Sequence, residues 1–114
     1  FTDNGVELRA AGRVHMNLSD LLKYGEIHLC HDSIGALGIT AENWNVLHSP
    51  ILNDYACGWV VESHDWSDGS ILWHNGSNTL WYALLMILPA KKLVLAFTTN
   101  NGSGVFFFSG ASSA

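Results

Sequence analysis

A histidine, an asparagine and a glycine stand in succession at residues 74–76, near the end of a predicted strand. Successive side chains of a strand point to opposite faces, so His74 and Gly76 share one face. Because glycine has no side chain, a substrate or another backbone can approach the strand closely at Gly76. An imidazole and a bare backbone edge are thus presented together on a rigid element. This arrangement predicts one wall of an active site, although residues 1–114 show no companion nucleophile.

The same residues have a structural alternative. A lone histidine on a strand is more often a hydrogen-bonded part of the fold than a catalytic group, and Asn78 fits turn chemistry as well as substrate contact. Metal binding is a second alternative, because histidines stand beside cysteine or acidic residues in segments 28–32 and 64–65. Zinc favours such ligands, but neither segment has the ligand spacing of a closed site. We therefore expect no metal.

The composition predicts a globular chain with a large apolar core. Hydrophobic residues make up 48% of the 114 residues and charged residues 13%, which excludes a disordered chain. The net charge of −5 and the five scattered basic residues predict no nucleic-acid partner. No apolar run reaches the roughly 18 residues of a membrane-spanning helix. Cys30 and Cys57 fit either a disulfide or two buried free thiols.

The elements that must position the motif are two helices followed by antiparallel strands. After a loop with a short extended piece over residues 1–17, Asn17 can cap a helix over about 18–30, and Thr40 can cap a second helix that ends near His48. A hairpin turn over residues 67–70 separates the first two strands. The predicted strands are 55–61, 71–76, 79–88 and 93–100. The predicted fold class is α+β, with a mostly antiparallel sheet flanked by helices.

Both faces of the two longest predicted strands are apolar. In the strand over 79–88, leucines, a tyrosine and a methionine alternate with Trp81, an alanine, a leucine and an isoleucine. Trp81 is therefore expected in the core, and a place in the wall of the active site is the less favoured alternative. A sheet of this kind must be covered on both faces. One amphipathic helix and one short helix are too little cover. We expect the rest from chain outside these residues, from a partner subunit or from self-association.

Three segments together resemble one protein family. Residues 10–24 (AAGRVHMNLSDLLKY) resemble the segment AGGVHMSLEDWAKF, residues 55–59 (YACGW) resemble the strand YGLGW, and residues 73–102 resemble the hairpin HNGSN…YA…P…TNNG. These segments belong to the C-terminal part of the serine beta-lactamase and penicillin-binding-protein-like family, particularly its class C-like serine hydrolases and esterases. The resemblance covers roughly residues 9–102, and its specificity comes from the order and spacing of the segments.

Family members place three motifs around one pocket: a nucleophile S-x-x-K, a Y-x-N or S-x-N loop, and a K-T-G or H-x-G strand. Only the third occurs here, at residues 74–76, and the other two are absent from the sequence. The resemblance therefore implies the C-terminal portion of one beta-lactamase/transpeptidase-like domain that lacks its N-terminal part, with Phe1 at a cut or a processed end. Residues 18–48 would form its helical region, 55–100 its strands and 101–114 its tail.

The family's chemistry is acyl transfer from an amide or ester to water, with a serine nucleophile. The resemblance assigns catalytic roles to His74, which would face the pocket, and to Ser77, whose backbone N–H would be one of two oxyanion donors. Asn75, Gly76 and Asn78 would contact the substrate, a small acyl compound such as a beta-lactam, peptide or ester. It implies no cofactor, and export to the periplasm or beyond.

A non-catalytic binding or interaction module of the same fold is the alternative from another functional class. Exposed aromatic strands would then recruit a partner. A longer reading frame with an upstream S-x-x-K motif supports the enzyme, and a natural start codon near Phe1 supports the module.

Overall fold

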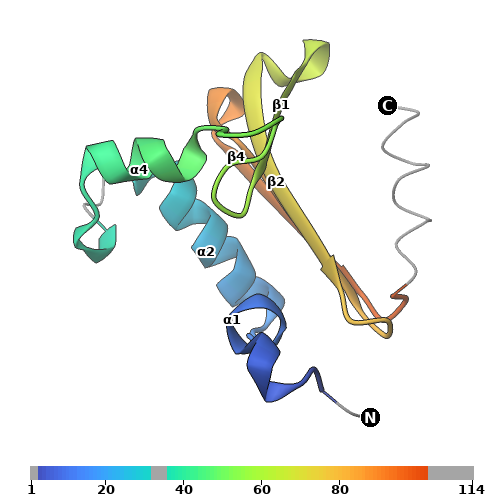
Figure 1. The fold of residues 1–114 in the computed structure, drawn as a ribbon. Coiled ribbons are helices and arrows are strands. Elements are labelled where there is room, and N and C mark those ends of the chain that lie inside the picture. Colours follow the sequence, from blue (N-terminus) through green and yellow to red (C-terminus); the bar gives the residue numbers. More distant parts are fainter. Residues whose placement is uncertain (1–2, 32–35, 103–114) are drawn as a thin grey trace.

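The computed structural model describes residues 3–31 and 36–102 (Figure 1). The fold is α+β, with a four-stranded antiparallel sheet of strand order β1-β2-β3-β4 and three α-helices in the described residues. Short 3-10 helices, η1 to η4, lie between these elements. The main elements in chain order are α1 (Arg9–Gly12), α2 (Leu18–Leu29), α4 (Ala41–His48), β1 (Val60–His64), β2 (Gly69–Ser77), β3 (Tyr82–Leu88) and β4 (Leu93–Thr99).

The two longer helices begin where their caps predict. Asn17 Oδ1 accepts a hydrogen bond of 2.8 Å from the backbone N–H of Asp20 at the start of α2. Thr40 Oγ1 accepts one of 3.2 Å from the N–H of Asn43 at the start of α4. Each bond satisfies one of the N–H groups that a helix N-terminus leaves without a partner. The predicted helix starts are confirmed.

The prediction of a loop over residues 1–17 is wrong for part of that segment, because η1 (Val6–Leu8) and α1 form there. Neither helix has a side-chain N-cap, so the sequence carries no start signal for them. Contacts across the turn hold them instead. Asn4 Nδ2 donates to the carbonyl of Gly12 at 2.7 Å, and Arg13 pairs with Asp3 at 3.0 Å.

The first strand lies later in the chain than predicted, at Val60–His64 rather than 55–61. Tyr55 joins the sheet region only through isolated bridges to Leu52 and Val60. Gly58 has a φ of +82°, a left-handed conformation that turns the chain before β1. The segment that resembles the family's YGLGW strand therefore begins as a turn.

Helix α2 covers one face of the sheet and forms the core with it (Figure 1). The buried cluster on this face consists of Ala56, Trp59, Leu72, Leu85 and Ile87, and Leu21 and Leu29 of α2 pack against it. The helix approaches β4 closely at Gly25. A Cβ atom on Gly25 would lie 2.5 Å from Cγ1 of Val94, so only glycine allows this distance.

The opposite face of β4 is largely exposed. Leu93 and Leu95 point away from α2 and are 41% and 48% exposed. This exposure is confined to β4, because Ile71 of β2 and Tyr82 and Leu88 of β3 lie on the same face and are buried. What covers the exposed part of β4 stays a prediction. None of the described helices combines the length and the hydropathy that crossing a membrane requires.

Cys30 and Cys57 are free and exposed, so neither the disulfide nor the buried thiols are found.

Candidate active site

A cavity of about 760 Å³ lies between one end of the sheet and the segment that leads into α2. Gly76, Ser77 and Asn78 line it from the end of β2 and the turn that follows. Met16 and Leu18 line it from the helix side. Cavities of several hundred Å³ with mixed apolar and polar walls are typical of small-molecule sites. Three of the five predicted site residues therefore border one cavity.

The edge of β2 that faces β1 is open beside this cavity. The pairing of the two strands runs from His64 opposite Gly69 to Val60 opposite Trp73 and ends there. In the described part of the chain, residues 74–77 of β2 have no strand partner on that side. Their other edge pairs with β3, from His74 opposite Leu85 onward. An extended substrate can therefore meet the backbone of this segment.

The turn after β2 fixes which backbone groups point to the open edge. The N–H of Asn78 donates to the carbonyl of Trp81 at 3.3 Å, so Asn78 directs its backbone groups toward β3. Backbone groups of successive strand residues point to alternate sides. The N–H of Ser77 therefore points to the opposite side, as does that of Asn75.

The pairing with β1 leads independently to the same direction. The N–H of Val61 donates to the carbonyl of Asp54 at 2.7 Å, away from β2. Its neighbour Val60 must then direct its backbone groups toward Trp73 on β2. Ser77 is four residues after Trp73, and backbone groups alternate between the two edges of a strand. The N–H of Ser77 therefore points to the same edge as that of Trp73, beyond the end of β1.

His74 is exposed and lies on the face of the sheet that carries Leu72 and α2. It stands opposite Leu85 of β3. The imidazole is therefore not enclosed in the interior. It is not among the residues that line the cavity, which begins two residues further on, at Gly76.

The side chains of Asn75 and Ser77 are engaged in the structure of the hairpin. Asn75 lies on the face opposite His74, and its Nδ2 donates to the hydroxyl of Tyr82 at 3.0 Å. Ser77 Oγ donates to the carbonyl of Gly102 at 2.6 Å and accepts from the N–H of Thr79 at 3.1 Å. What Ser77 can offer a substrate is therefore its backbone N–H rather than its hydroxyl.

Asn78 forms the turn of this hairpin. Its Oδ1 accepts from the N–H groups of Leu80 and Trp81, at 3.3 and 3.0 Å. The amide nitrogen of the same side chain has no role in these bonds and can contact a molecule in the cavity. Trp81, which the pattern predicts in the core, is 44% exposed and lines the cavity instead, because the turn delays the start of β3 to Tyr82.

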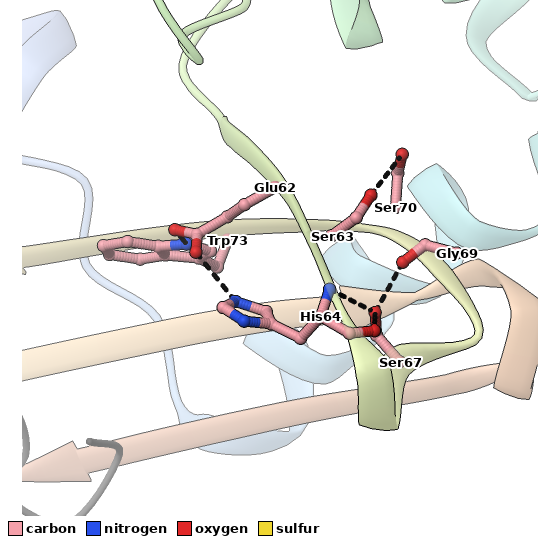
Figure 2. Close-up of polar contacts among 7 residues, drawn as sticks. All are labelled: Glu62, Ser63, His64, Ser67, Gly69, Ser70 and Trp73. Atoms are coloured by element: carbon pink, nitrogen blue, oxygen red, sulfur yellow. Dashed lines mark hydrogen bonds and ion pairs between the residues drawn. The ribbon is translucent and has the colours of Figure 1, made fainter.

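A second polar cluster lies on the face opposite α2 (Figure 2). Nε2 of His64 and Oε2 of Glu62 are 2.8 Å apart, and the other carboxylate oxygen accepts a hydrogen bond of 2.6 Å from Nε1 of Trp73. The ring of His64 stacks on Trp66, with 5.0 Å between the ring centroids. The alternation of β1 places Glu62 and His64 on one face, and this is the only sequence signal for the pair.

Ser67 does not complete a catalytic triad with this pair (Figure 2). Its hydroxyl is buried and bonds to backbone groups of His64 and Gly69. The carboxylate orients the imidazole, but the serine closes the 3-10 turn η3 (Asp65–Ser67). Across residues 3–31 and 36–102, no group of three or more histidine, cysteine or acidic side chains is placed to hold a metal ion. Asp32 of the segment 28–32 lies outside the described residues.

No model of a known protein family matches this chain, and neither do the curated proteins or the solved structures that were compared with it. The family resemblance thus rests on the residues of the three segments.

Proposed function

We propose that the chain is the C-terminal portion of a serine hydrolase of the beta-lactamase and penicillin-binding-protein-like family, with the beta-lactamase/transpeptidase-like fold. The reaction is acyl transfer from an amide or ester to water. One observation carries the proposal: the N–H of Ser77 points to an open strand edge that borders a cavity. The H-x-G motif at residues 74–76 precedes that N–H directly.

In the proposed mechanism, the nucleophilic serine belongs to an S-x-x-K motif outside residues 1–114. It attacks the acyl carbonyl while a neighbouring base takes its proton. The carbonyl oxygen becomes an oxyanion, which accepts hydrogen bonds from the N–H of Ser77 and from the N–H of the nucleophile. Gly76 lets the acyl group approach the strand. The imidazole of His74 is exposed two residues before the cavity wall, so its proposed contact is with a part of the substrate, or with a base, that extends beyond this cavity.

The isolated chain should not turn over nitrocefin or p-nitrophenyl acetate, because it has no nucleophile for acyl transfer. A spectrophotometric assay of the purified 114-residue chain measures this. Saturable turnover that His74→Ala abolishes would contradict the proposal. The matched positive experiment uses the parent reading frame. We expect that frame to encode S-x-x-K upstream, and replacement of that serine by alanine to abolish turnover. A parent frame without the motif would refute the proposal.

The exposed face of β4 favours the alternative, a binding module of the same fold, as much as it favours a missing N-terminal part. In both cases the isolated chain should dimerise or aggregate through Leu93 and Leu95, because exposed apolar strands associate. Light scattering at several concentrations measures the mass. Leu95→Lys should shift the chain toward monomer, whereas Leu52→Lys, at an exposed position outside the sheet, should not. A monodisperse monomer with a cooperative melt would contradict this prediction.

A further inference from the structure

A cluster of three imidazoles and two indoles joins α2 to α4, and the proposed active site does not use it. His28 of α2 is 8% exposed, and its Nδ1 lies 2.8 Å from Nε2 of His48 at the end of α4. The rings of Trp44 and Trp59 pack against His28 at centroid distances of 5.1 and 4.9 Å. His31 stacks on Trp44 at 5.0 Å.

The hydrogen bond between His28 and His48 depends on their protonation. One ring nitrogen must donate and the other must accept, so the bond exists when the two facing nitrogens share one proton. A first additional proton places a positive charge inside the aromatic cluster, where charged groups lose their hydration. A second makes both facing nitrogens donors and brings two like charges together. The bond is then lost.

Among residues 3–31 and 36–102, the groups around the pair offer no compensating negative charge. Tyr24 packs on His28 from α2, with its ring centroid 4.8 Å away, and Trp59 precedes β1. The charges that act on His28 are those of His48 and His31, and both are positive when protonated. The acidic and thiol groups of the adjoining segments, at Glu26, Cys30, Glu42 and Cys57, are exposed.

Burial and these like charges lower the pKa of both histidines. Burial, followed by His48 and His31, lowers the pKa of His28 from 6.5 to about 4. Burial and His31 also lower the pKa of His48. The attached arrangement therefore binds fewer protons than a detached one between about pH 6.5 and 4. The contribution of the two neutral histidines to the attachment of α4 is fully present above pH 6.5. It falls as the pH decreases through this range.

Helix α4 has few other attachments. It crosses the end of α2 (Figure 1) and forms no extensive contact with β3 or β4. Its carbonyl at Leu47 accepts a hydrogen bond of 3.3 Å from the N–H of Cys57. Its buried side chain, Trp44, sits inside the histidine cluster, and its indole N–H has no hydrogen-bond partner. The packing of these rings is thus the main contact of α4.

We propose that His28 and His48 form an acid-sensitive latch, which fixes α4 on α2 when they share a proton and releases α4 when both are protonated. Helix α2 and strands β2–β4 keep their own core of Leu72, Leu85 and Ile87 during this step. The proposal is independent of the proposed catalytic function, because none of its residues lines the cavity at Gly76.

NMR of the whole 114-residue chain between pH 8 and 3.5 tests the latch. We expect the rings of His28 and His48 to titrate below pH 6.5, together with loss of the α4 amide signals, while the β2–β4 signals persist. Uptake of two protons changes the ratio of attached to released α4 by about 100-fold per pH unit. In His48→Gln the change should fall to about tenfold per pH unit.

His15→Gln is the matched control, because His15 is 68% exposed and lies far in sequence from the cluster. It should leave the transition unchanged. The proposal is overturned if both rings titrate at or above pH 6.5, if α4 is lost only together with the sheet, or if His48→Gln retains the steep transition. The ring titration of the unmodified chain decides the matter even if the variants do not fold.

Discussion

Replacement of Ile87 by alanine is expected to lower the free energy of unfolding by about 2–5 kcal/mol. Ile87 is 0% exposed and lies on β3 within the buried cluster under α2. The substitution removes three carbon atoms from a site with neighbours on all sides. The stability loss combines the lost transfer of these atoms from water with the cavity that they leave. Urea denaturation followed by circular dichroism measures it.

Leu95→Ala is the matched control for this prediction. Leu95 lies on the neighbouring strand but on the opposite face, where it is 48% exposed. At protein concentrations too low for association through this face, its truncation should change the free energy of unfolding by no more than about 0.5 kcal/mol, as is typical of exposed positions. Equal losses at the two positions would show that the face opposite α2 is as buried as the core, against the structure.

Ser77→Pro is expected to reduce turnover in the proposed parent enzyme by about 10²–10³-fold. Proline lacks the backbone N–H that the proposed mechanism uses as an oxyanion donor. The strand itself should tolerate the change, because a proline is accepted where the missing N–H faces an open edge. Steady-state kinetics with p-nitrophenyl acetate or nitrocefin, after a melt has established folding, measure the effect.

Ser77→Ala distinguishes a role of the backbone N–H in turnover from a role of the side-chain hydroxyl. It keeps the N–H and removes the hydroxyl that bonds to Gly102 and Thr79. Turnover should stay within a few-fold of the unmodified enzyme, and stability should fall by about 1 kcal/mol. A loss as large as that of Ser77→Pro would assign the role to the hydroxyl, and full turnover of Ser77→Pro would refute the oxyanion assignment.

Local signals in the sequence predicted the helices and hairpins well. The caps at Asn17 and Thr40 act within three residues, so the starts of α2 and α4 could be inferred without tertiary information. Helix α1 could not, since Asn4 and Arg13 hold it through contacts eight and ten residues apart in sequence. The position of β1 depends on the turn at Gly58, which displaced the predicted strand.

Parts of the candidate site could also be predicted. The alternation of side chains along β2 predicts that His74 and Asn75 lie on opposite faces of the sheet. The resemblance of residues 74–76 to the H-x-G motif predicts that the backbone N–H of Ser77 is the group available to a substrate. The edge is open because the pairing of β1 with β2 ends at Trp73. The register of the two strands determines where this pairing ends. The contact between His28 and His48 joins side chains 20 residues apart in sequence. Their meeting depends on how α4 packs on α2, and no local pattern encodes that geometry.

The missing side chain at Gly25 has an expected consequence for the cavity at the far end of the same helix. Gly25 determines how deeply α2 seats against Val94. One and two turns earlier, Leu21 and Leu18 form part of the cavity wall. If the helix responds as a rigid rod, a larger residue at position 25 would push α2 away from Val94 and widen the gap at those leucines. The size of the molecules that the cavity admits would thereby depend on a residue outside its wall.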